Sequence, residues 1–171
     1  AELRLMLSIT RYLLIVVAAV LPMFSAQAAD KSGIEALAAQ ALANLRGHVS
    51  AAGPLLDEAA GMLLFPDVVK VGFGGAEEYG EGCLMVGGKP VAYYATAGAS
   101  YGLPLGVQTK SEVVLFMDQE TLEAFRSGAD WKVGTDGEVT LVRAAAGASV
   151  DGATAGGPIL GFVFTDEGLV D

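Results

Sequence analysis

The stretch that decides the fold runs from Gly61 to Tyr101 and reads GMLLFPDVVKVGFGGAEEYGEGCLMVGGKPVAYYATAGASY. Short apolar, β-branched or aromatic runs alternate in it with glycine pairs, a pattern typical of strands joined by tight turns. These runs predict strands over 68–73, 82–86 and 90–96. Gly87-Gly88 separates the last two, and because glycine readily adopts positive φ angles, the pair predicts a two-residue hairpin turn. The stretch holds no arrangement of residues typical of catalysis or metal binding.

Helices and further strands are predicted on both sides of this stretch. Ser32 and Glu35 form a capping box before an apolar face with helical spacing, which predicts a helix over 32–46. Pro54 predicts the start of a second short helix that continues to Met62. Asp118 is expected to cap a third helix near 118–127. The remaining apolar runs predict strands over 106–117, 131–133, 139–144 and 159–164. The expected fold class is α+β, with N-terminal helices packed on a glycine-rich antiparallel sheet or barrel.

The first 28 residues are interpreted as a signal peptide rather than as part of the fold. Arg4 and Arg11 precede an apolar run from Leu13 to Phe24, and the small residues that follow predict a cleavage site after Ala28. A membrane anchor is the competing interpretation, but the run is shorter than the ~20 residues that a membrane-spanning helix needs. We therefore expect a periplasmic or secreted protein whose residues 29–171 form a single domain.

Composition narrows the classes of function. Acidic residues outnumber basic ones by 20 to 10, for a net charge of −10, so nucleic acid is not an expected partner. The chain contains 23 glycines, which favour strands and tight turns over helices. Cys83 is the only cysteine, so no intramolecular disulfide can form, and its apolar neighbours predict a small buried side chain.

Three motifs suggest chemistry but lack the context that it needs. Gly98-Ala99-Ser100-Tyr101-Gly102 matches the nucleophile elbow of serine hydrolases, yet a strand pattern rather than a helix follows. Glu77, Glu78 and Glu81 could hold a cation, but the competing interpretation is a solvated turn between strands. The only histidine, His48, cannot form a zinc site with one cysteine. We expect no enzymatic activity, no metal and no cofactor.

Several separated motifs, in order, resemble the SYLF domain family, a lipid-binding module also known as a yeast-type actin-binding domain. The resemblance spans roughly Leu55 to Val170. It rests on Leu64-Phe65-Pro66, Lys70 with Gly72-Phe73-Gly74, Tyr79-Gly80-Glu81-Gly82, Gly88-Lys89-Pro90, Tyr93-Tyr94 with Thr96-Ala97-Gly98, Tyr101-Gly102-Leu103, Leu105-Gly106, Val114-Leu115-Phe116, Ala124-Phe125 and Gly161-Phe162-Val163-Phe164.

The resemblance implies an α+β domain of the bacterial cell envelope that binds phospholipid without catalysis. Actin, a partner of some family members, is not expected in a bacterial periplasm. Family members continue past Gly168-Leu169 with a further strand, so we expect a truncated C-terminal strand in this chain. A protein-interaction or structural module without a lipid ligand is the alternative function.

The lipid hypothesis assigns roles to six residues. Lys70 and Lys89 are expected to meet phosphate, and Lys110 lies in the same predicted sheet, so the three lysines either form a basic patch or are scattered over the surface. The aromatic side chains expected to meet acyl chains or headgroups are Phe73, Tyr79, Tyr94 and Tyr101.

Overall fold

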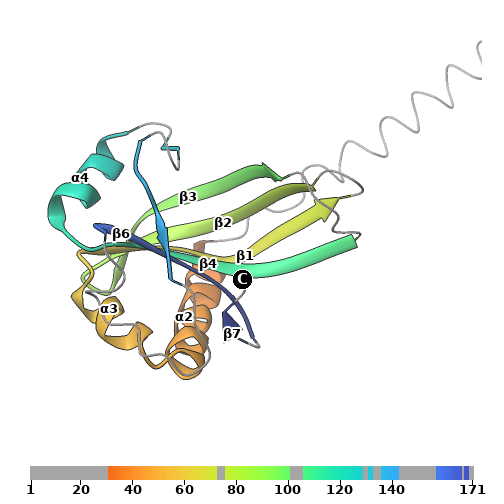
Figure 1. Ribbon diagram of the computed structural model, residues 1–171, viewed down its shortest axis with the longest axis horizontal. Coiled ribbons are helices and arrows are strands. Elements are labelled where there is room, and N and C mark those ends of the chain that lie inside the picture. The colour runs from red at the N-terminus through yellow and green to blue at the C-terminus, as the bar shows by residue number, and fades with distance from the viewer. Residues whose placement is uncertain are drawn as a thin grey trace, which may run out of the picture. The chain divides into compact units, whose positions relative to one another are not determined.

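The long strands of the glycine-rich region pair in one antiparallel sheet (Figure 1). The computed structural model describes residues 31–72, 76–100, 106–128, 131–132, 136–142, 157–166 and 168–169. The strands are β1 (Gly61–Gly72), β2 (Ala76–Val86), β3 (Lys89–Ser100), β4 (Gly106–Phe116), β5 (Thr140–Leu141), β6 (Ile159–Thr165) and β7 (Gly168–Leu169). Their order is β3-β2-β1-β4-β6-β5, β7 pairs with β6, and only the short β5–β6 pair is parallel.

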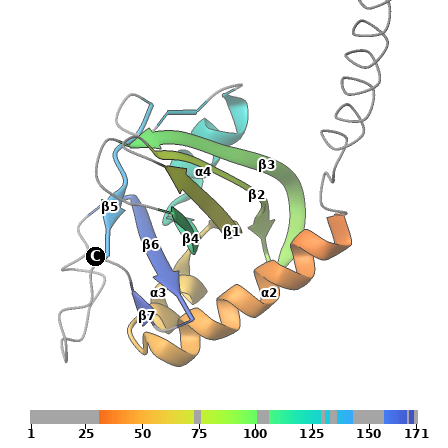
Figure 2. The ribbon, with the colours of Figure 1, turned by 90° about the vertical axis from the view of Figure 1, so that its right-hand side faces the viewer.

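Helices cover both faces of this sheet. The two N-terminal helices, α2 (Lys31–His48) and α3 (Ala52–Glu58), lie on one face, called here the α2 face, and α4 (Gln119–Ser127) packs on the opposite α4 face. Figure 2 shows α2 crossing beneath the strands while α4 lies above them. The predicted α+β fold class is confirmed. In the described part of the chain the sheet is open, with β3 at one edge and β5 and β7, which both pair with β6, at the other.

Alternation along the strands divides the apolar residues into two cores. Leu64, Cys83 and Leu115 point toward α2, whereas Leu63, Leu84 and Phe116 point toward α4. A central strand buried on both faces is therefore apolar at successive positions, as Leu63, Leu64 and Phe65 are. The Cys83 side chain is fully buried beneath α2, as expected for a small hydrophobe.

A bulge in the central strand β1 changes which residues face each side. Leu64 pairs with Cys83 and Val69 with Tyr79, so five steps along β1 match four steps along β2. Pro66 lies in this bulge, where its missing N–H costs no ladder hydrogen bond, and its carbonyl accepts from Ser111 Oγ at 2.7 Å. In β1, the α2 face therefore receives the side chains with even residue numbers before the bulge and those with odd residue numbers after it.

Local predictions are confirmed where turn or cap chemistry decides the backbone. Gly87 and Gly88 have φ angles of 60° and 77° and form the β2–β3 hairpin turn. Asp118 caps α4, because its carboxylate accepts from the Thr121 N–H at 2.7 Å.

Two predicted elements are wrong. The second helix begins at Ala52 and ends at Glu58, and Met62 lies in β1 rather than in that helix. Apolar residues from Gly61 onward belong to a strand with two buried faces, which lacks the alternation that identifies a half-exposed strand. Trp131 and Lys132 lie outside any strand, and the predicted strand over 139–144 is reduced to β5 in the described residues.

Candidate functional site

The sheet extends beyond the helices at one end, which we call the projecting end. It consists of residues 68–72 of β1, 76–80 of β2, 96–100 of β3 and 106–110 of β4. In Figure 1 these strand segments run to the right, past α2, α3 and α4. Their two faces differ in chemistry.

On the α2 face, the projecting end carries an exposed apolar patch of Val69, Val71, Tyr79 and Val107. Val71 lies directly opposite Val107 on β4, and Val69 lies directly opposite Tyr79 on β2. These four are 37%, 46%, 55% and 68% exposed in the order Val69, Val71, Tyr79, Val107. They are four of the seven large hydrophobic residues that are exposed in the described part of the chain, so the exposure is concentrated rather than scattered.

Carboxylates border this patch along β2. Glu77 lies directly opposite Val71, and the Tyr79 hydroxyl lies 3.3 Å from Glu81 Oε1. The three glutamates predicted to occupy a turn therefore lie within strand β2, and that prediction is wrong. Glu77 and Glu81 share the face of Tyr79, whereas Glu78 points to the opposite face.

On the α4 face, the projecting end carries a network of two lysines and two glutamates. Glu78 lies 3.3 Å from Lys70 Nζ and 3.0 Å from Lys110 Nζ, and Lys110 also lies 2.9 Å from Glu112. Burial opposes the charge of Glu78, but the hydrogen bonds and positive charges of Lys110 and Lys70 outweigh it and hold its pKa below the ordinary value. Burial likewise opposes the charge of Lys110, and Glu112 and Glu78 outweigh it and raise its pKa.

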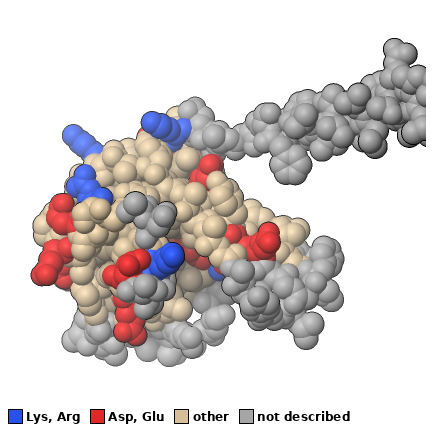
Figure 3. Space-filling view, turned by 90° about the horizontal axis from the view of Figure 1, so that it is seen from above, with Lys and Arg blue, Asp and Glu red and all other residues tan. Residues whose placement is uncertain are grey.

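The three lysines considered for a basic patch do not gather at one place. Lys70 and Lys110 lie together, but their charges are balanced by Glu78 and Glu112. Lys89 lies next to the β2–β3 hairpin, at the other end of the sheet, on the order of 25 Å from Lys70 by residue count. Figure 3 shows basic side chains as separate spots among uncharged and acidic surface.

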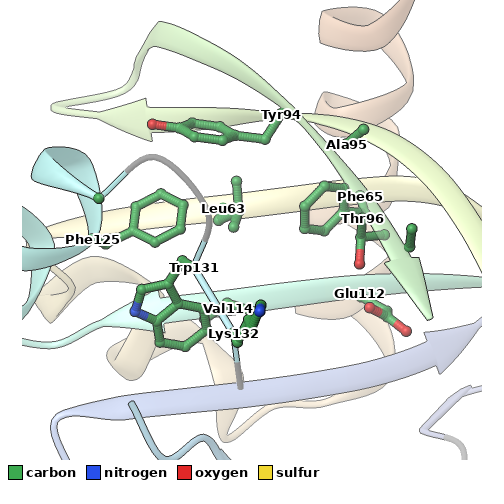
Figure 4. A pocket seen from close by; sticks show the side chains of 12 residues that line it. Leu63, Phe65, Tyr94, Ala95, Thr96, Glu112, Val114, Phe125, Trp131 and Lys132 are labelled. Carbon is green, nitrogen blue, oxygen red and sulfur yellow. The ribbon is translucent and has the colours of Figure 1, made fainter. Parts of the chain in front are cut away.

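A groove of about 540 Å³ opens on the α4 face (Figure 4). β1, β3 and β4 line it together with the end of α4 and the segment that follows. Its lining residues are Leu63, Phe65, Tyr94, Ala95, Thr96, Ala97, Glu112, Val114, Phe125, Gly128, Trp131 and Lys132. The side chains labelled in Figure 4 place three aromatic rings at one end of the groove, and Thr96 and Glu112 near the other.

The aromatic end of the groove is built by contacts between rings. The Tyr94 and Phe125 ring centroids are 5.0 Å apart, and those of Phe125 and Trp131 are 5.7 Å apart with an edge-to-face angle of 75°. Phe116, fully buried beneath them, stacks on Phe125 at 4.8 Å. These contacts hold the aromatic wall against the sheet.

The structure does not bring the predicted site residues together at one place. Tyr79 belongs to the apolar patch, Tyr94 to the groove and Lys70 to the charged network, while Lys89 belongs to none of these. Phe73 and Tyr101 lie outside the described residues.

Sequence reasoning missed the three valines of the patch and the groove residues Phe125 and Trp131. Two of these valines alternate with Lys70 in Val69-Lys70-Val71, which indicates one apolar face of β1. The bulge in β1 decides which face that is.

Other expected features are placed as follows. Ser100 is the last residue of β3, and the next described element is strand β4 from Gly106 rather than a helix. In the described ranges, no three His, Cys, Asp or Glu side chains are grouped as a metal would require. None of the described helices combines the length and apolar character needed to cross a bilayer.

No known family model matches the chain, and no curated protein matches it.

Proposed function

We propose that this protein is a non-enzymatic phospholipid-binding domain of the bacterial cell envelope. The observation that carries the proposal is the apolar patch of Val69, Val71, Tyr79 and Val107 on the projecting end, which extends past the described helices. The resemblance of the chain to lipid-binding SYLF domains agrees with it. In this proposal the patch inserts between headgroups, and the Tyr79 hydroxyl stays at the polar boundary.

The energetics favour weak, reversible attachment. Burying the exposed portions of four side chains contributes on the order of 3 kcal/mol, which is less than stable anchoring requires. Glu77 and Glu81 border the patch, and the lysines of the projecting end are already paired with glutamates. Apolar insertion, rather than attraction between a basic patch and anionic headgroups, therefore supplies most of the proposed binding free energy.

Vesicle flotation tests the proposal. Residues 29–171, which include every described element, are mixed with vesicles of phosphatidylcholine alone or with phosphatidylglycerol, with and without Ca²⁺. The triple variant Val69→Thr, Val71→Thr and Val107→Thr keeps side-chain shape and strand propensity but replaces apolar methyl groups by hydroxyls. We expect it to partition into vesicles at least about ten-fold more weakly than the unaltered domain.

Val91→Thr is the matched control, because Val91 is 45% exposed on β3 and lies outside the patch. We expect its partitioning to equal that of the unaltered domain. Equal partitioning of the triple variant would exclude the patch as the membrane contact. Circular dichroism and thermal unfolding of each variant establish that the fold is retained.

The edge strand β3 supports the alternative function, an envelope module that binds another protein. In the described part of the chain, β3 pairs only with β2, so one side of this twelve-residue strand is left for a further strand. Absence of flotation on every vesicle by a folded sample would contradict lipid binding and favour this alternative.

A further inference from the structure

The groove on the α4 face lies on the opposite side of the sheet from the apolar patch, and it has the chemistry of a small-molecule site. Its volume of about 540 Å³ falls in the range typical of ligand pockets, roughly 300–1,000 Å³. Leu63, Phe65 and Val114 supply aliphatic and aromatic surface from two neighbouring strands. Such a surface is suited to an apolar ligand.

We propose that this groove binds one long-chain fatty acid, with the hydrocarbon chain along the aromatic wall and the carboxylate near Lys132. The proposal concerns a single dissolved molecule rather than a membrane surface. It does not rest on the function proposed for the patch.

The glycines of β2 explain why the groove crosses the sheet. Between β1 and β3, the β2 residues that face α4 include Gly80 and Gly82, which present no side chain. Phe65 lies over Gly82, since its Cδ1 atom is 2.6 Å from the position that a Gly82 Cβ would occupy. The side chain of Phe65 can therefore extend over β2 toward the β3 residues of the groove.

The charges of the lining residues favour an anionic headgroup. Among the described lining residues, Glu112 is the only carboxylate, and it lies 2.9 Å from the Lys110 ammonium, which balances its charge. Lys132 is the only ammonium of the groove lining in the part of the chain that the structure describes, and no residue described there forms an ion pair with it. Asp136 Oδ2 accepts from the Lys132 backbone N–H at 2.8 Å and so holds the backbone at this position.

Fluorescence gives a direct test, because Trp131 is the only tryptophan of the chain and lines the groove. The full chain is titrated with dibromostearate, a fatty acid brominated at the middle of its chain, at concentrations below micelle formation. Bromine quenches tryptophan only at contact distance, so we expect saturable quenching by dibromostearate. Unbrominated oleate should remove that quenching by competition.

Two pairs of variants locate the ligand. Thr96→Phe fills the groove and is expected to weaken binding at least about ten-fold, whereas the isosteric Thr96→Val should leave it nearly unchanged. Lys132→Gln is expected to weaken oleate binding several-fold. The same variant should still release dibromostearate to oleyl alcohol, which has no charge, as readily as the unaltered protein does. Lys89→Gln, at an exposed lysine outside the groove, should alter neither.

Absence of saturable quenching in a folded sample would overturn the proposal, and so would quenching that Thr96→Phe leaves unchanged. Equal effects of Lys132→Gln on oleate and oleyl alcohol would overturn the assignment of the headgroup to Lys132. The Val69→Thr, Val71→Thr and Val107→Thr variant should bind dibromostearate normally even though it loses vesicle binding. This combination separates failure of the groove proposal from failure of the membrane proposal.

Discussion

Gly82 lies against the carbonyl of Leu64 so closely that a Cβ on Gly82 would be 1.9 Å from that oxygen. The contact occurs where β1 bulges beside Pro66, and it brings the backbones of β1 and β2 together. Gly80 meets the same bulge, because a Cβ there would be 2.9 Å from Val68 Cγ2. The Gly80-Glu81-Gly82 sequence of β2 is thus the complement of the bulge in β1.

Replacing Gly82 by alanine should therefore destabilise the domain. The added methyl group can be accommodated only by separating two paired strands, and we expect a loss of about 3 kcal/mol or more in the free energy of unfolding. Chemical denaturation followed by circular dichroism measures it. Gly98→Ala is the control, since nothing lies within 4 Å of its Cβ position and its stability should change by less than about 1 kcal/mol. Similar losses in both variants would contradict the role assigned to the bulge.

The charged network predicts a pH dependence of stability. Glu78→Gln removes the carboxylate between Lys70 and Lys110 and should lower the free energy of unfolding by about 1 kcal/mol at neutral pH. Because the folded pKa of Glu78 lies below its ordinary value of 4.5, its contribution is fully present above that pH and is lost as the pH falls through the folded pKa. The difference in the free energy of unfolding between the unaltered protein and Glu78→Gln should therefore shrink below pH 4.5. Chemical denaturation at a series of pH values measures it.

Glu77→Gln provides the comparison for this measurement. Glu77 is the sequence neighbour of Glu78 but points to the other face, and no ion pair joins it to a described residue. Its replacement should change stability by less than about 0.5 kcal/mol at neutral pH. A loss as large as that of Glu78→Gln would indicate an effect of overall charge rather than of the network.

The cap of α4 can be tested separately. Asp118→Ala removes the acceptor of the Thr121 N–H and should cost about 1 kcal/mol of stability. Asp118→Asn retains a side-chain oxygen and should cost much less. Because α4 carries Phe125, whose ring contacts Trp131, loss of the cap should also change the fluorescence of Trp131. Equal stability of the alanine variant and the unaltered protein would contradict the cap.

Membrane attachment through the patch predicts a weak dependence on salt. If insertion of valine and tyrosine side chains supplies the binding free energy, raising NaCl should leave flotation almost unchanged, because ionic screening acts on charges. Lys89→Glu should likewise have little effect. A steep loss of flotation with salt would instead show that basic side chains supply the attraction.

Sequence reasoning was most successful where a few neighbouring residues determine the backbone. The Gly87-Gly88 turn and the Asp118 cap need only their own local chemistry, and both are confirmed. The start of β1 was missed because Leu63, Leu64 and Phe65 are buried on both faces and show no alternation.

The candidate surfaces depend on long-range pairing that no local pattern contains. Val71 and Val107 are 36 positions apart in the sequence and become neighbours only through the β1–β4 register. The groove depends on the approach of Trp131 to Phe125, after a helix whose position against the sheet is set by packing. Tyr79 and Tyr94 could therefore be named in advance, but neither the surfaces to which they belong nor the contributions of Phe125 and Trp131 could be.

The burial of Cys83 beneath α2 restricts the chemistry of its thiol. Burial and the nearby charge of Glu35 raise the pKa of its thiol, so both the access of oxidants and the reactive thiolate form are restricted. A chain in which α2 detaches from the sheet would expose the thiol and become able to form a disulfide-linked dimer. The rate at which a thiol reagent modifies Cys83 therefore reports how often the N-terminal helix leaves the sheet.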